Sequence, residues 1–167
     1  MKQVIERRAF LSRMWKWGIG LVAVAGAWTS WDILQPVALS GFGGKIRFGD
    51  AAKVPATGIE TVAEAQAYVT KDPAGEVVAL WWRCPHLGCR VPWCESSGQF
   101  ECPCHGSTFN RLGEYRSGPT PRGLDQFDTE IAEGALFIDT GSISDGPGPG
   151  PESIDEPIGP PCESGGH

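Results

Sequence analysis

The longest apolar stretch of the chain lies near its N-terminus. Residues 17–34 contain one charged residue, Asp32, and they follow a basic segment, residues 1–16, that holds five Lys/Arg and one Glu. As a helix this stretch is roughly 27 Å long, enough to cross the hydrocarbon core of a bilayer. Positive charge ahead of an apolar segment stays in the cytoplasm. The pattern predicts a single-pass anchor in a bacterial-type cytoplasmic membrane, with the N-terminus cytoplasmic and the bulk of the chain extracytoplasmic.

The N-terminal segment also has the features of an export signal. Arg7-Arg8 followed closely by Phe10-Leu11 resembles a twin-arginine motif, which serves proteins exported in the folded state. Small residues typical of a cleavage site occur within the apolar run rather than after it. Tryptophans stand at both ends of the run, where they are expected at the two membrane interfaces. This pattern favours a retained anchor, and a cleaved signal remains the alternative.

The rest of the pattern is that of short strands between turns. Residues 35–44 are rich in Gly and Pro and are expected to form a flexible tether. The head, residues 45–139, contains two β-type runs, 67–70 and 76–82, on either side of the turn sequence Asp72-Pro73-Ala74-Gly75, which predicts a hairpin. A helical turn is expected at 64–67, and further strands at 99–102, 124–127 and 135–139. The pattern predicts an all-β fold of mostly short antiparallel strands, preceded by one helix.

Composition narrows the possible classes. The 167 residues leave room for one domain with appendages, and 23 Gly with 14 Pro disfavour an all-helical bundle. From residue 17 onward nine Lys/Arg face 19 Asp/Glu, a net charge of −10, which argues against nucleic acid as a partner. The last segment, residues 140–167, has seven Gly, six Pro, five acids and no Lys or Arg, and it is expected to be disordered or draped over the surface.

Four of the six cysteines lie in two short clusters that each contain a histidine. The clusters are Cys84-Pro85-His86-Leu87-Gly88-Cys89 and, after 12 residues, Cys102-Pro103-Cys104-His105-Gly106-Ser107. Thiolates and imidazoles together suit either a tetrahedral zinc ion or a mixed-ligand iron–sulfur centre. Both metal types are compatible with the spacing alone.

These clusters resemble the Rieske iron–sulfur protein of quinol-oxidising cytochrome complexes. The resemblance extends to Val91-Pro92-Trp93 after the first cluster and to Gly118-Pro119-Thr120-Pro121, which is similar to the family's proline loop. The Val-Pro-Trp element is most similar to the bf-type branch and its menaquinol-oxidising bacterial relatives. The resemblance covers about residues 76–139.

The resemblance implies a small antiparallel Rieske-type sandwich with a cluster-binding subdomain, a [2Fe–2S] cofactor and a role for each residue of the two clusters. Cys84 and Cys102 are expected to bind one iron and His86 and His105 the other, with Cys89 and Cys104 joined in a disulfide. Both histidines are also expected to contact quinol and to couple electron uptake to proton uptake. Ser107 is expected to donate a hydrogen bond to a cluster sulfur, and Leu87 and Pro119 to shield the cluster.

One position departs from the pattern of high-potential family members. Phe109 stands where many of them have a tyrosine that donates to a ligand sulfur, which predicts a lowered potential suited to menaquinol. Tyr115 is a possible compensating donor. Trp81 and Trp82, beside the first cluster, are expected to pack rather than to carry electrons.

Cys94 and Cys162 lie outside the family pattern. A disulfide between them is expected to tie the acidic tail across the head. The alternatives are two free thiols, a bridge to another chain, or attachment of another group.

The resulting functional expectation is a membrane-anchored electron-transfer subunit without independent catalysis. The resemblance implies as partners a cytochrome b subunit, a c-type cytochrome acceptor, quinol and the lipid bilayer, within a dimeric multi-subunit complex. One alternative is the Rieske small subunit of an exported molybdenum oxidoreductase such as arsenite oxidase, for which a cleaved N-terminus would be expected. A zinc-stabilised binding module is an alternative from a different class.

Overall fold

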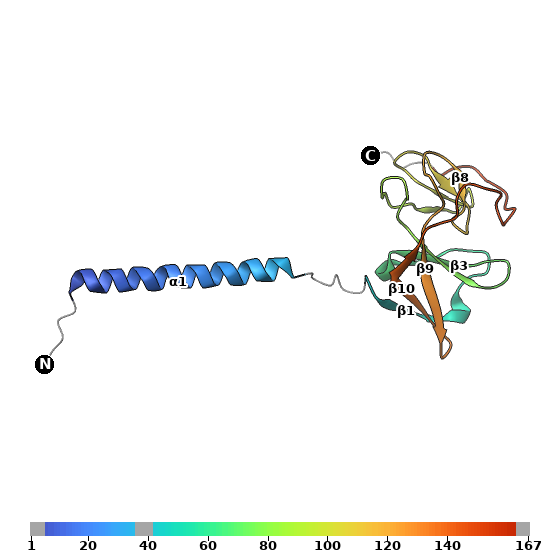
Figure 1. Ribbon diagram of the computed structural model, residues 1–167. Helices are drawn as coiled ribbons and strands as arrows, with labels where there is room; N and C mark the ends of the chain where they lie inside the picture. The colour runs from blue at the N-terminus through green and yellow to red at the C-terminus, as the bar shows by residue number, and fades with distance from the viewer. Residues whose placement is uncertain (1–5, 36–41, 163–167) are drawn as a thin grey trace. The chain divides into compact units, whose positions relative to one another are not determined.

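The computed structural model describes residues 6–35 and 42–162, which belong to a helical N-terminal unit and a β-rich C-terminal unit (Figure 1). The N-terminal unit contains helix α1 (Arg7–Leu34). The C-terminal unit contains β1 (Lys45–Asp50), η1 (Ala51–Lys53), β2 (Glu60–Val62), η2 (Ala63–Ala65), β3 (Ala67–Lys71), β4 (Val77–Trp81), β5 (Trp93–Cys94), β6 (Gln99–Glu101), β7 (Thr108–Phe109), β8 (Tyr115–Ser117), β9 (Gln126–Ala132) and β10 (Ala135–Ser144).

Helix α1 covers the predicted apolar stretch and begins ten residues before it. It ends where Gln35 becomes extended (φ −72°, ψ 127°), because a residue that precedes proline, here Pro36, is disfavoured in the helical region. Within the described residues, no helix is both long and apolar enough to cross a membrane. The predicted helix is therefore confirmed, whereas the predicted membrane span is not. Three glycines, three tryptophans and Asp32 within residues 17–34 dilute its apolar character.

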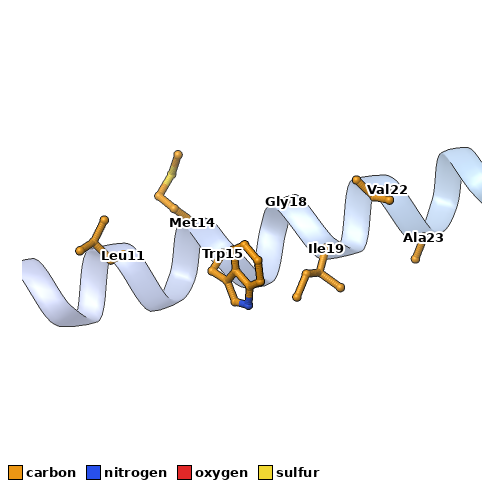
Figure 2. Close-up of a pocket in the computed structure, with 7 residues that line it drawn as sticks. All are labelled: Leu11, Met14, Trp15, Gly18, Ile19, Val22 and Ala23. Atoms are coloured by element: carbon orange, nitrogen blue, oxygen red, sulfur yellow. The ribbon is translucent and has the colours of Figure 1, made fainter.

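The side chains of α1 are exposed along its whole described length. Seven residues from Leu11 to Ala23, which recur at the helical spacings i, i+3 and i+4, line an apolar hollow along the helix (Figure 2). Gly18, one of the seven, has no side chain. The helix alone therefore leaves a continuous apolar stripe unburied.

The larger sheet of the C-terminal unit has the strand order β1-β10-β9-β4-β3-β2, and all its pairs are antiparallel. The predicted hairpin is present as β3 and β4. Its turn closes because the Asp72 carboxylate accepts hydrogen bonds from the backbone N–H groups of Ala74 and Glu76. The helical turn expected at 64–67 is the 3₁₀ helix η2. Strand β10 continues to Ser144, past the boundary expected at residue 139.

The expected tether is shorter than its composition suggests. Residues 36–41 lie outside the described residues, but residues 42–44 are packed against the sheet. The Phe42 ring lies 5.9 Å from that of Trp81 and 6.0 Å from that of Phe127. The Thr140 hydroxyl accepts hydrogen bonds from the N–H groups of Gly43 and Gly44. Glycine composition alone does not reveal these contacts, because they are made to residues that lie between 39 and 97 positions away.

The smaller sheet has the strand order β5-β6-β7-β8 and is also antiparallel (Figure 1). The first cysteine cluster, residues 84–89, lies in the connection from β4 to β5, and the second, residues 102–107, joins β6 to β7. One hydrophobic cluster contains side chains from both sheets, and it includes Cys84 and Cys102 among its buried members. An antiparallel, all-β head with a subdomain for the two cysteine clusters is thus confirmed.

The tail crosses the head as an ordered strap, defined here as residues 145–162. Two arginines of the small subdomain hold it: Arg111 pairs with Glu156 at 2.8 Å and Arg116 with Glu152 at 2.9 Å. The side chains of the two arginines are 5% and 6% exposed and those of the two glutamates 30%, so the cations are removed from water while the carboxylates stay partly exposed. Of the two expectations for the tail, the surface-draped one holds for residues 145–162, and residues 163–167 lie outside the described residues.

Candidate metal site

The two cysteine clusters fold into matching six-residue loops. In each loop the N–H of the first residue donates to the carbonyl of the sixth (Cys84 to Cys89 and Cys102 to Ser107, both 2.8 Å). The N–H of the fifth residue, a glycine, returns to the carbonyl of the first. Gly88 and Gly106 have φ of +85° and +73°, a conformation that glycine adopts without strain. The repeat places Cys84 and Cys102 at equivalent positions of two facing loops.

Two thiols and two imidazoles gather where the loops face each other. Cys84 and Cys102 carry free thiols and are buried. The rings of His86 and His105 lie 4.8 Å apart and nearly perpendicular, with His86 half-buried and His105 exposed. The sulfurs therefore face the core and the imidazoles face outward. Such a set suits a centre that is bound from the inside and meets partners from the outside.

The remaining cysteines of the loops form a disulfide. Cys89 and Cys104 are joined by an S–S bond of 2.03 Å, which links the end of the first loop to the middle of the second. The sulfurs of Cys89, Cys102 and Cys104 all lie within 4.8 Å of one another. The bridge therefore holds the two loops together directly beside one of the free thiols.

Burial raises the pKa of the Cys84 thiol, and the neighbouring Cys102 thiol raises it further. The backbone N–H groups of His86 and Leu87 oppose this rise because they donate toward the Cys84 sulfur. A metal centre binds thiolates, so its insertion here must displace the proton from the Cys84 thiol, whose pKa is raised.

Ser107 provides a second polar group at the site. Its side-chain oxygen is buried and has no hydrogen-bond partner among the described residues. An unpaired buried hydroxyl is costly, because nothing replaces the water it has lost. A sulfide or thiolate acceptor between the two loops would pair with it. The residues present thus fit an iron–sulfur group better than they fit an empty, self-satisfied core.

The proline loop, residues 118–121, approaches Ser107 closely at Gly118. Gly118 has φ +100°, and a Cβ added there would lie 2.4 Å from the Ser107 Cα. Pro119, which follows, is exposed, and Leu87 at the tip of the first loop is 71% exposed. Both apolar side chains are therefore exposed to solvent, and their role in shielding the site stays a prediction.

Neither Phe109 nor Tyr115 donates a hydrogen bond to a ligand sulfur. Phe109 is fully buried and has no polar atom. The Tyr115 hydroxyl donates to the Gly118 carbonyl at 2.9 Å, so its proton is already used to hold the proline loop. The expected compensation by Tyr115 therefore does not occur in this arrangement.

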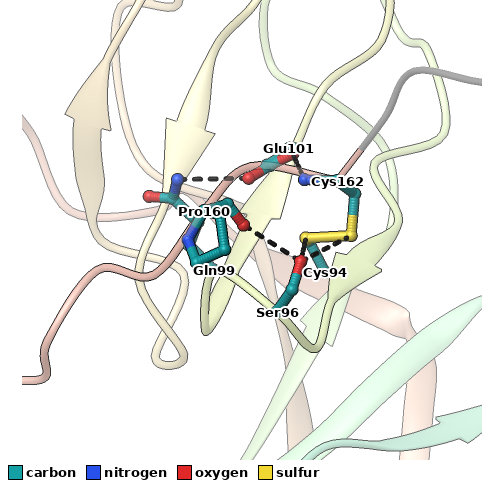
Figure 3. The surroundings of a disulfide bond; sticks show 6 residues. All are labelled: Cys94, Ser96, Gln99, Glu101, Pro160 and Cys162. Carbon is teal, nitrogen blue, oxygen red and sulfur yellow. Dashed lines mark hydrogen bonds between the residues drawn. A yellow bond between two sulfur atoms is a disulfide. The ribbon is translucent and has the colours of Figure 1, made fainter.

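Cys94 and Cys162 are joined by a second disulfide, with an S–S bond of 2.05 Å. Figure 3 shows its surroundings: Ser96 donates to the Pro160 carbonyl at 3.0 Å, and the Cys162 N–H donates to Glu101 at 3.2 Å. Glu101 immediately precedes Cys102, so the bridge fastens the strap to the base of the second loop.

Two arginines that hold the strap, Arg111 and Arg116, could not be singled out from the sequence. Arg111 donates to the Thr70 hydroxyl and the Lys71 carbonyl, which ties the strap to β3. Arg116, which lies in β8, donates to Glu152 and so ties the strap to β8. The signal that could have revealed them is the acidic tail itself, because five carboxylates without any cation need partners elsewhere. Trp81 and Trp82 pack against aromatic residues, namely Trp81 on Phe42 and Phe127 and Trp82 on Tyr68.

Known proteins with similar sequences include members of one family of iron–sulfur proteins. Residues 47–128 match the Rieske [2Fe-2S] domain. The chain is 43% identical over 68 residues to the chloroplastic cytochrome b6-f complex iron-sulfur subunit of Chlamydomonas reinhardtii. These 68 residues cover 41% of this chain and 33% of that protein. It is 33% identical over 96 residues to the menaquinol:cytochrome c reductase iron-sulfur subunit of Geobacillus thermodenitrificans, covering 55% of this chain and 57% of that one. The chain thus spans about a third and just over half of these two relatives.

A third match covers more of the chain. The chain is 30% identical over 138 residues to the cytochrome b6-f complex iron-sulfur subunit of Chlorobaculum tepidum, and the match covers 80% of this chain and 75% of that protein. It extends well beyond the two loops and so includes the surrounding fold. The chain therefore belongs to the family of Rieske iron–sulfur subunits of cytochrome b6-f and related bc-type complexes, and its cofactor is a [2Fe–2S] cluster.

Proposed function

We propose that this chain is the electron-transfer subunit of a membrane-bound quinol:cytochrome c oxidoreductase. In this role it accepts one electron from quinol and passes it to a c-type cytochrome. The observation that carries the proposal is the pair of imidazoles at the outer side of two buried thiols, with rings 4.8 Å apart. In the same proposal Cys84 and Cys102 bind one iron of the cluster, and His86 and His105 bind the other.

The [2Fe–2S] cluster supplies one-electron redox chemistry at a raised potential, because two neutral imidazoles replace two thiolates. The chain's own residues supply the rest. His105, which is exposed, presents a ring nitrogen to a quinol hydroxyl and takes up its proton. The exposed Leu87 side chain excludes water from that contact. After the electron has left, the imidazole releases the proton to the surrounding water.

Menaquinol is the quinol that the site fits best. Menaquinol is a stronger reductant than ubiquinol, so it can reduce a cluster of lower potential. Phe109 has no donor, and the Tyr115 hydroxyl is occupied by Gly118, so one hydrogen bond that would raise the potential is missing. The Geobacillus thermodenitrificans relative, which is named for menaquinol, supports the same choice.

Membrane association is assigned to α1. Its exposed apolar stripe needs partners, and the basic residues ahead of it favour a cytoplasmic N-terminus with the head on the extracytoplasmic side. We propose that α1 attaches the chain to the membrane complex beside a cytochrome b subunit, in a dimeric assembly. A head that rotates on the tether, restricted to the part of residues 35–44 that precedes the packed residues 42–44, is part of the same proposal. Protease treatment of intact cells tests the orientation, because only an extracytoplasmic head is cleaved.

The proposed function is tested in membranes of the source organism that lack this chain. Quinol-dependent reduction of a c-type cytochrome should be lost and should return when the wild-type chain is restored. The variant Leu87→Ala should insert its cluster normally, as judged by the electron paramagnetic resonance (EPR) spectrum, and should slow quinol oxidation. Undiminished cytochrome reduction in the absence of the chain would refute the proposal.

A further inference from the structure

Two arginines flank the first ligand loop. Arg83 immediately precedes Cys84, and Arg90 immediately follows Cys89. Their backbones pair as an isolated antiparallel bridge, so the two residues face each other at the root of the loop. Both side chains are exposed. We call Arg83 and Arg90 the arginine pair.

Each guanidinium of the arginine pair is held by a tryptophan. Arg83 lies over the Trp81 ring at 5.1 Å from its centroid, and Arg90 lies over the Trp82 ring at 4.1 Å. The Arg83 guanidinium also reaches into the first loop, since a Cβ added at Gly88 would lie 2.9 Å from its Nε. Stacking of this kind restricts the rotamers of a long side chain, so less entropy is lost when an anion binds.

The arginine pair is not neutralised by acidic residues of its own chain. Within the described parts of the chain, Lys45, Arg111, Arg116 and Arg122 each form an ion pair, whereas Arg83 and Arg90 form none. They are also the only Lys or Arg between residues 72 and 110, the stretch that holds both ligand loops. The pair is thus a local cationic patch on a body whose net charge from residue 17 onward is −10.

The surroundings of the pair complete a docking face. Leu87, 71% exposed, is adjacent in sequence to Gly88, and a Cβ added at Gly88 would lie 2.9 Å from Arg83 Nε. The exposed His105 lies beside His86, which belongs to the same loop as Leu87. An exposed apolar side chain, an exposed imidazole and two guanidinium groups held by tryptophans thus all belong to the two ligand loops or adjoin the first of them. A partner that fits this face has an apolar contact area bordered by carboxylates, which guanidinium groups bind through two parallel hydrogen bonds.

We infer that the arginine pair docks the carboxylate side chains of an acidic redox protein at the cluster end of the head. This inference rests on the proposed electron-transfer function and names the chemistry of the partner surface. Anionic lipid headgroups offer a similar anion, but a body of net charge −10 is repelled by an anionic membrane surface as a whole. A protein with carboxylates confined to its docking face meets the pair without that repulsion.

The test uses the full-length, cluster-loaded chain in neutral detergent, with short-chain poly-L-glutamate as the probe, because a short chain carries few charges and is repelled little by the acidic body. Binding is measured by titration calorimetry at low ionic strength. The double variant Arg83→Gln/Arg90→Gln should bind the probe at least about fivefold more weakly than the wild type, since two charge contacts are lost. The double variant Arg47→Gln/Lys53→Gln is the matched control, because it removes the same net charge from two exposed residues outside the ligand loops. It should bind as the wild type does.

Two further arms separate the inference from its rivals. Arg83→Lys/Arg90→Lys keeps both charges and should retain most of the binding, which excludes misfolding as the cause of a loss. Vesicles of phosphatidylglycerol and of phosphatidylcholine test a lipid partner. Equal weakening in the matched control overturns the inference. So does a variant that loses preference for phosphatidylglycerol while binding of poly-L-glutamate is unchanged.

The rate of electron transfer provides a second readout. The reduced cluster should give its electron to the anionic oxidant ferricyanide more slowly in the Arg83→Gln/Arg90→Gln variant, and to cationic tris(phenanthroline)cobalt(III) faster. If each oxidant reacts at the same rate with the variant as with the wild type, the inference is overturned. An unchanged EPR spectrum in that case leaves the proposed function standing. Loss of the cluster signal in the wild type would instead refute the proposed function.

Discussion

Gly118 is pressed against Ser107 so closely that a Cβ on the glycine would lie 2.4 Å from the Ser107 Cα and 2.8 Å from its Oγ. Ser107 Oγ is in turn buried without a partner among the described residues. The proline loop therefore fixes the hydroxyl that is expected to donate to a cluster sulfur. The loop acts on the cluster through this contact as well as by covering it.

The variant Gly118→Ala should disturb this contact. The added methyl group must move either the proline loop or Ser107, so we expect a lower midpoint potential and weaker retention of the cluster. Potentiometric titration followed by EPR measures both. Gly134→Ala is the matched control, because Gly134 also has a positive φ (+78°) but no atom within 4 Å of the position that the added methyl group would take. A potential that falls equally in both variants would show that backbone strain, not the contact, is responsible.

Ser107→Ala should lower the midpoint potential by about 60 mV, the equivalent of a tenfold change in a one-electron equilibrium. The reason is that a hydrogen bond to a cluster sulfur stabilises the more negative, reduced state. The control is Ser97→Ala, since Ser97 Oγ is also buried and unpaired among the described residues but lies in the segment between the two loops. An unchanged potential in Ser107→Ala would show that Ser107 donates no hydrogen bond that affects the cluster.

Phe109→Tyr should raise the midpoint potential. Phe109 is fully buried in the cluster of side chains that also contains Cys84 and Cys102, and a hydroxyl at this position is expected to reach a ligand sulfur. Tyr115→Phe is the informative comparison, because its hydroxyl holds the Gly118 carbonyl and should affect the potential only through the proline loop. An identical titration curve for Phe109→Tyr and the wild type would contradict the argument for a lowered potential.

Replacing Cys94 and Cys162 together by serine should lower the unfolding free energy by about 2–4 kcal/mol, because the bridge closes a loop between residues 68 positions apart. Thermal unfolding monitored by circular dichroism measures the loss under oxidising conditions. The wild type treated with a reductant should approach the variant. A variant as stable as the oxidised wild type would indicate that the ion pairs of the strap suffice to hold it.

Much of the head could be predicted from sequence because its signals are local. The turn sequence Asp72-Pro73-Ala74-Gly75 specifies the β3–β4 hairpin, and the two cysteine clusters carry their own glycines and candidate ligands. The loops could therefore be located from the residues alone, whereas the pairing of Cys89 with Cys104 followed from the family resemblance.

The remaining features depend on contacts between distant residues. Phe42 packs on Trp81 and Phe127, so part of a glycine-rich segment with the composition of a tether belongs to the head. Strand β10 continues to Ser144 because β9 offers a partner through a register shift, which no local pattern reveals. The strap depends on Arg111 and Arg116, which have the sequence context of ordinary surface residues until their acidic partners are placed.

Low-temperature EPR of the purified chain, reduced in parallel with ascorbate and with dithionite, tests the proposed cluster and its potential together. We expect a spectrum of low average g, typical of mixed histidine and cysteine ligation, that is already present with ascorbate. Replacing His105 by alanine should abolish it. A signal that appears only with dithionite would contradict a role in accepting electrons from quinol, and no signal from an iron-replete sample would contradict the cluster itself.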